Sequence, residues 1–88
     1  MKYTVVWKKA AEDELAKLWL DAPDRTAIAD AVDEIDRLLS VDPLDQGESR
    51  GGKRRILLFE PLGVLFTVEE DDRKVNVIHI WRSSRKAS

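Results

Sequence analysis

The sequence of 88 residues contains no cysteine and a single histidine, His79. Without cysteine the chain can form neither a disulfide framework nor a thiolate metal site, and catalysis by a thiolate is excluded. One histidine leaves few ligands for any other metal site, and we expect neither a metal nor another cofactor. A nucleotide-binding loop is absent too, because Gly51-Gly52-Lys53 lacks the first glycine and the trailing hydroxyl of that motif.

Long apolar runs are also missing. The N-terminal apolar stretch, Tyr3–Trp7, is far too short for the core of a signal peptide or for a membrane span. We therefore expect a cytoplasmic protein with no membrane partner. The length and the hydrophobic content of 43% predict one domain, residues 1–88, with one core and a small margin of stability.

Charge is distributed unevenly along the chain. Residues 49–88 contain nine Lys and Arg against five Asp and Glu, whereas residues 1–48 contain six against twelve. A chain with one acidic half and one basic half suits a protein that meets a phosphate backbone or an acidic partner on one surface only. The pI near 5.4 counts against non-specific nucleic-acid binding as the main activity.

Hydrophobic periodicity predicts an α+β protein with the element order β-α-α-β-β-β. We expect a first strand at Tyr3–Trp7, a helix at Ala10–Leu20, a second helix capped by Asp24 and ending near Leu39, and strands at Arg54–Phe59, Val64–Val68 and Val75–Trp81. The short connections predict an antiparallel helical hairpin packed on one face of a mainly antiparallel sheet. Ser40–Gly52 reads as a loop, and Asp33 and Arg37 are spaced to pair along the second helix.

The predicted sheet has two apolar faces. Alternation along the last strand puts Val75, Val77, His79 and Trp81 on one face and Asn76, Ile78, Ile80 and Arg82 on the other. Two helices cover only one face, so we expect the apolar residues of the other face to contact another chain. That chain can be a second copy of this protein in a homodimer. The alternative is that the Ser40–Gly52 loop folds over that face.

Several segments, taken in order, follow the pattern of a known family. They are Tyr3-Thr4-Val5-Val6-Trp7, Ala10-Ala11-Glu12-Asp13-Glu14-Leu15, Asp42-Pro43, Arg54-Arg55-Ile56, Gly63-Val64-Leu65-Phe66-Thr67-Val68 and Val77-Ile78-His79-Ile80-Trp81-Arg82. Over nearly the whole chain this pattern resembles the RelE/ParE superfamily of bacterial toxin–antitoxin toxins. The resemblance implies a RelE/ParE-like fold and an antitoxin that neutralises the toxin by wrapping its surface. RelE-like members are ribosome-dependent endoribonucleases that cut messenger RNA, whereas ParE-like members inhibit DNA gyrase.

The resemblance also points to particular cations. Lys53 and Arg55 resemble the family's basic residues on the strand after the loop, and Arg82 with Arg85 resembles its cationic end of the last strand. The chain has Gly63-Val64-Leu65 where the ribonucleases commonly carry an arginine, and it has no tyrosine or histidine after Arg85. These departures favour, as the alternative function, a non-catalytic module of the same fold, which is either a ParE-like gyrase inhibitor or an inactive RelE-fold protein that only pairs with a partner.

Cleavage of RNA through its own 2′-hydroxyl needs a base, an acid and cations that stabilise the charge on phosphorus. For proton transfer the candidates are His79 and a lysine of lowered pKa, Lys53. We expect the cations Lys53, Arg55, Arg82 and Arg85 to gather at one rim of the sheet, with Arg54 as a further substrate-binding residue. This enzyme would need no metal.

Each candidate has a structural alternative. His79 can be a sheet residue packed beside Trp81, and the basic run from Lys53 to Arg55 can be a solvated strand start that discourages edge pairing. Trp81 is more often an interface or core anchor than a platform for stacked bases. A small RNA-binding domain without toxicity is a third and weaker reading, because the chain lacks the surplus of basic residues that such domains carry.

Overall fold

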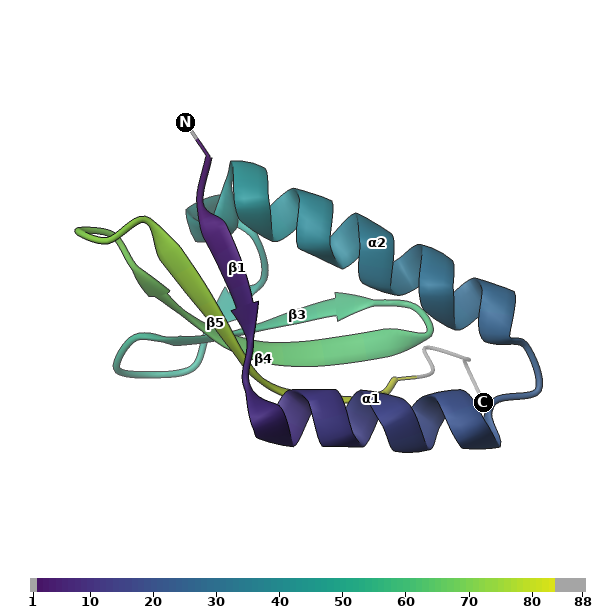
Figure 1. Cartoon of the computed structure of the whole chain (residues 1–88). Coiled ribbons are helices and arrows are strands. Elements are labelled where there is room, and N and C mark those ends of the chain that lie inside the picture. The colour runs from purple at the N-terminus through teal and green to yellow at the C-terminus, as the bar shows by residue number, and fades with distance from the viewer. Residues whose placement is uncertain (1, 84–88) are drawn as a thin grey trace.

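The computed structural model describes residues 2–83 and has two helices packed on one sheet (Figure 1). The elements in chain order are β1 (Thr4–Trp7), α1 (Lys9–Asp21), α2 (Arg25–Val41), a short 3-10 helix η1 (Pro43–Asp45), β2 (Glu48–Ser49), β3 (Arg54–Phe59), β4 (Leu62–Glu69) and β5 (Lys74–Arg82). The predicted α+β class and element order are confirmed. The segment expected to be a loop also contains η1 and β2.

The five strands form one sheet in the order β1-β5-β4-β3-β2. Strand β1 runs parallel to β5, and the other neighbours are antiparallel. The pairing with β1 covers only Lys74–Val77, so the second half of β5 continues beyond the reach of β1. There α1 lies beside β5 in place of a strand.

The core lies between α2 and the central strands. One stripe of α2 is buried at helical spacing, namely Ile28, Ala31, Ile35 and Leu39. It packs with Leu62, Val64 and Phe66 of β4, each 0% exposed. We call this the helix-covered face of the sheet and the opposite side the open face.

Local interactions explain where α2 begins. Pro23 cannot continue α1, and the Asp24 carboxylate accepts a hydrogen bond from the Ala27 amide at 3.2 Å, as the N-cap prediction requires. The predicted pairing of Asp33 with Arg37 is wrong. Arg37 instead pairs with Glu34, whose position one turn away gives a bidentate contact, and this hydrogen bond lowers the pKa of the Glu34 carboxyl.

A β-bulge reverses the predicted faces at the end of β5. Leu65 is opposite His79 while Phe66 is opposite Val77, so Ile78 is an extra residue without a partner on β4. Val75 and Val77 therefore share the helix-covered face with Ile80, and His79 lies on the open face with Trp81. Simple alternation grouped His79 and Trp81 with Val77, and that prediction is wrong.

The open face carries an aromatic side chain, Trp81, near the end of β5. A Cβ added to Gly63 would lie 2.7 Å from the Trp81 indole and 2.9 Å from Leu58 Cδ2, so the indole lies directly over the Gly63 backbone. Leu58 remains 50% exposed. The 40–52 segment does not cover this face, because Leu44 of η1 lies near Arg55 and Val68, whose side chains point to the helix-covered face.

Candidate functional site

The predicted cations lie at two ends of the sheet. Arg54 pairs with Thr67 near the start of β3, whereas Arg82 pairs with Leu62 at the end of β5. Thr67 and Leu62 are five residues apart along β4, which corresponds to roughly 17 Å. The expectation that Lys53 and Arg55 gather with Arg82 at one rim is therefore wrong. Arg85 lies outside the described residues.

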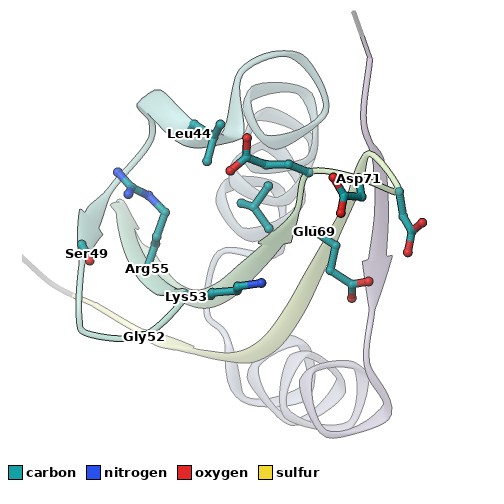
Figure 2. Close-up of a pocket in the computed structure, with 10 residues that line it drawn as sticks. Leu44, Ser49, Gly52, Lys53, Arg55, Glu69 and Asp71 are labelled. Atoms are coloured by element: carbon teal, nitrogen blue, oxygen red, sulfur yellow. The ribbon is translucent and has the colours of Figure 1, made fainter.

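Lys53 lines a groove with walls of opposite charge (Figure 2). The groove has a volume of about 570 Å³. Its lining residues are Leu44, Ser49, Gly52, Lys53, Arg55, Val68, Glu69, Glu70, Asp71 and Asp72. In Figure 2 the Lys53 side chain extends toward Glu69, and Glu69 and Asp71 lie across the groove from Arg55. Four carboxylates against two cations make this groove a poor match for a phosphate chain.

Arg55 already has partners within the protein. Its Nε donates to the Gln46 carbonyl at 2.9 Å, and Nη2 donates to the Gly47 carbonyl at 3.2 Å. These bonds tie the segment before β2 to β3. A phosphate at Arg55 would compete with two hydrogen bonds that hold this segment, so the guanidinium has a structural role in the free protein.

His79 is likewise engaged by a carboxylate. Its Nδ1 lies 3.0 Å from Glu14 Oε2, and the backbone amide of Ile80 donates to Glu14 Oε1 at 3.0 Å. Glu14 thus binds β5 where β1 no longer reaches it. His79 and Arg82 point to opposite faces of the strand, since an odd number of residue steps separates them after the bulge. The roles predicted for His79, Arg82, Lys53, Arg54 and Arg55 stay predictions.

A polar cluster on the open face gives one pH-dependent contact. Asn76, 5% exposed, donates from Nδ2 to Glu69 Oε2 at 2.5 Å. This hydrogen bond is the main cause that lowers the pKa of the Glu69 carboxyl, and the charge of Lys74 adds to it. Asn76 Oδ1 finds no partner among residues 2–83.

We expect Glu69→Gln to destabilise the protein at neutral pH and to have little effect in acid. Because the folded pKa of Glu69 is lowered, its contribution to stability is fully present above its unfolded pKa and is lost as the pH falls through the folded pKa. Urea unfolding of the wild type and the variant at several pH values measures the difference in their free energies of unfolding. A difference that stays constant as the pH falls contradicts a stabilising role of the Glu69 carboxylate. The carbon-13 chemical shift of the Glu69 carboxyl group gives an independent titration.

A second groove, which sequence reasoning missed, lies between α1 and α2. Its volume is about 630 Å³, and its residues are Glu12, Leu15, Ala16, Trp19, Leu20, Ile28, Ala29, Val32 and Asp33. Trp19 is 39% and Leu20 is 70% exposed. Because Trp19 and Leu20 are adjacent in the chain, they widen the apolar stripe of α1 beyond the side that faces the core. This widening of the stripe is visible in the sequence.

Two findings concern the described residues as a set. None of the helices within residues 2–83 combines the length and apolar character needed to cross a membrane. The same residues bring together no group of three or more His, Asp or Glu side chains suited to a metal ion.

Comparisons with known proteins give a fold and no close relative. No protein-family model matches the sequence, and no curated protein matches it. Among solved structures, the chain is similar to the toxin–antitoxin complex RelBE2 from Mycobacterium tuberculosis, with 19% identity and a TM-score of 0.75 over 93% of this chain and 92% of that one.

Two further structures share the same architecture. One is the chromosomal ParDE toxin–antitoxin system from Pseudomonas aeruginosa, with 19% identity and a TM-score of 0.73 over 94% of this chain and 98% of that one. The other is the isolated Escherichia coli RelE toxin, with 16% identity and a TM-score of 0.70 over 96% and 87%. The resemblance read from the sequence is confirmed at the level of architecture, and this chain has the RelE/ParE fold.

Proposed function

We propose that this chain is the toxin of a toxin–antitoxin pair and that it acts by binding a macromolecular target, under the control of a cognate antitoxin protein. The observation that carries the proposal is the fold likeness over nearly the whole chain to proteins solved as toxin–antitoxin complexes. Exposed apolar side chains on the open face and between the helices support it, because patches of this kind mark contacts with other chains.

The arrangement of the candidate residues favours binding over cleavage. Within residues 2–83, Arg55 is bound to backbone carbonyls, His79 contacts Glu14, and Arg82 lies at the far end of the sheet from Lys53. General acid–base cleavage needs these groups within hydrogen-bond reach of one phosphate. Inhibition of a protein target such as DNA gyrase makes no such demand.

A metal-independent endoribonuclease acting on ribosome-bound messenger RNA is the second candidate. Arg82 is exposed at the end of β5, and Arg85 follows it three residues later in the sequence. The family resemblance pairs these two residues as the cationic end of the last strand, and charge-assisted hydrogen bonds from arginine suit a phosphate group. In this reading Arg82 and Arg85 bind the scissile phosphate, and His79 or Lys53 remains the candidate for proton transfer.

Induced expression in bacteria tests the toxin proposal. We expect growth arrest that is relieved by co-expression of the protein encoded in the adjacent reading frame. The growth arrest caused by Arg82→Ala is compared with that caused by Arg37→Ala, a control in which the arginine pairs with Glu34 on the surface of α2. Normal growth with abundant, folded wild-type protein ends the proposal.

Assays with purified protein then separate the two candidates. A binder leaves transcripts intact in a translating extract, and a gyrase inhibitor blocks DNA supercoiling. Codon-positioned cleavage of messenger RNA that is lost in Arg82→Ala and kept in Arg37→Ala would replace the binding mechanism with the endoribonuclease.

A further inference from the structure

The groove beside Lys53 has two walls of opposite charge that do not neutralise each other (Figure 2). One wall lies at the beginning of β3 and carries Lys53 and Arg55, and the other lies at the β4–β5 hairpin and carries the carboxylates of residues 69–72. No ion pair among residues 2–83 involves Lys53 or Asp71. Charges on both walls are therefore available to a ligand.

Contacts within the protein hold both walls in place. On the cationic wall, Arg55 donates to the carbonyls of Gln46 and Gly47. On the acidic wall, Glu69 accepts a hydrogen bond from the side chain of Asn76. The two walls are also joined through the sheet, because β3 and β4 are antiparallel neighbours. A ligand that binds between them therefore loses little free energy in ordering the site.

Two apolar residues line the same groove. Val68 of β4 is 7% exposed, and Leu44 of η1 is 41% exposed. A long basic side chain matches such a lining, because its methylene groups pack on apolar surface while its charged head stays in a polar environment. An inorganic ion would gain nothing from Val68 and Leu44. The lining therefore favours an organic cation with an aliphatic stem.

The balance of charges gives the sign of the ligand. Four carboxylates outnumber the two cations of the lining, so a ligand with a net positive charge is favoured. Because Lys53 is unpaired, a ligand that also carries an anionic group is favoured over one that does not. We propose that this groove binds a free basic amino acid, arginine or lysine, with its carboxylate at Lys53 and Ser49 and its side-chain cation at Asp71. This site goes beyond the proposed function and does not depend on it.

Titration of the whole protein with three matched small molecules tests the proposal. L-Arginine is the ligand. Nα-acetyl-L-arginine amide keeps the guanidinium group and the net charge but lacks the carboxylate, as an arginine residue within a peptide does. L-Citrulline keeps the shape and the carboxylate but lacks the side-chain cation. Binding is followed by the NMR signals of the Leu44 and Val68 methyl groups, and we expect L-arginine to bind about fivefold more tightly than either control.

Single substitutions assign the two ends of the ligand. Lys53→Gln should weaken L-arginine about fivefold without weakening the acetylated amide, so the preference for the free amino acid disappears. Asp71→Asn should weaken both arginine ligands about threefold and leave L-citrulline unchanged. The controls Lys17→Gln and Asp33→Asn make the same changes in net charge at exposed positions of the two helices, and they should leave all three affinities unchanged. All four residues are exposed, so the variants are expected to fold, and circular dichroism checks this.

Any of three results would overturn the proposal. The first is that L-arginine leaves the Leu44 and Val68 signals unchanged at about 10 mM, which would occupy most of a site with a Kd of about 1 mM. The second is an equal loss of affinity in Asp71→Asn and Asp33→Asn, because the attraction would then belong to the acidic surface as a whole. The third is that the acetylated amide binds as tightly as L-arginine, because the groove would then not recognise the free amino acid.

Discussion

Phe66→Ala should remove about half of the free energy of unfolding of this protein. Phe66 is 0% exposed at the centre of β4, where the sheet meets α2. Replacing a buried phenylalanine by alanine costs about 3–5 kcal/mol, because contacts are lost and a cavity remains. A chain of this size has roughly 5–10 kcal/mol in total.

Thermal unfolding followed by circular dichroism measures the effect. For a domain of this length we expect a fall in Tm of roughly 15–30 °C. Leu58→Ala on the neighbouring strand is the control, since Leu58 is 50% exposed on the open face and its loss should be much smaller. Similar losses for the two variants would show that the core is not centred where the structure puts it.

The fold was predictable because its signals are local. The stripe of α2 that ends at Leu39 has a clear helical period, Asp24 follows a proline, and the three last strands are joined by short turns. Each of these signals needs only a window of about 15 residues. The parallel pairing of β1 with β5 joins residues about 70 apart in the chain, and no local pattern reports it.

The separation of Lys53 from Arg82 follows from the directions of the strands. Two successive hairpins make the first and third strands run in the same direction, so the start of one and the end of the other lie at opposite ends of the sheet. That rule alone separates Lys53 from Arg82. Proximity of a cation to a strand end leaves open which end of the sheet it occupies, because the direction of the strand decides it.

Other features depended on contacts that a sequence does not show. The bulge at Ile78 moves His79 and Trp81 to the open face, and a single unpaired residue leaves no mark in the alternation. The acidic tip of the β4–β5 hairpin, residues 70–72, is only a short connection in the sequence, yet in space it lines the same groove as Lys53. The net charge of each half of the sequence therefore gives the wrong electrostatic potential at this groove. That potential is set by segments that meet only after folding.

The proposed binding function uses a surface rather than a catalytic centre, and this agrees with how the charged groups among residues 2–83 are satisfied. Arg55 and Glu14 each hold a segment to the sheet through backbone contacts. Trp19 and Leu58, by contrast, are large apolar side chains that stay 39% and 50% exposed among residues 2–83. In a small domain with little stability to spare, large exposed side chains without an internal role are the best guide to what the protein binds.

Gly47→Ala should destabilise the protein by about 3 kcal/mol, the largest effect we expect outside the core. Gly47 has φ of 71°, and a Cβ there would lie 2.3 Å from the Ile56 carbonyl oxygen. Relief of that contact requires backbone movement where β2 pairs with β3. The same movement would stretch the bond from Arg55 to the Gly47 carbonyl.

Gly52→Ala separates conformational strain from the steric clash. Gly52 also has a positive φ, of 56°, but a Cβ there would meet no atom within 4 Å. Its replacement should cost only about 1 kcal/mol. Urea unfolding compares the two variants, and hydrogen exchange of the Ile56 amide reports on the β2–β3 pairing. Equal losses of stability in the two variants would mean that Gly47 does not approach Ile56 closely in solution. The Arg55 hydrogen bonds to the Gln46 and Gly47 carbonyls would then lose their support, and with them the structural role of Arg55.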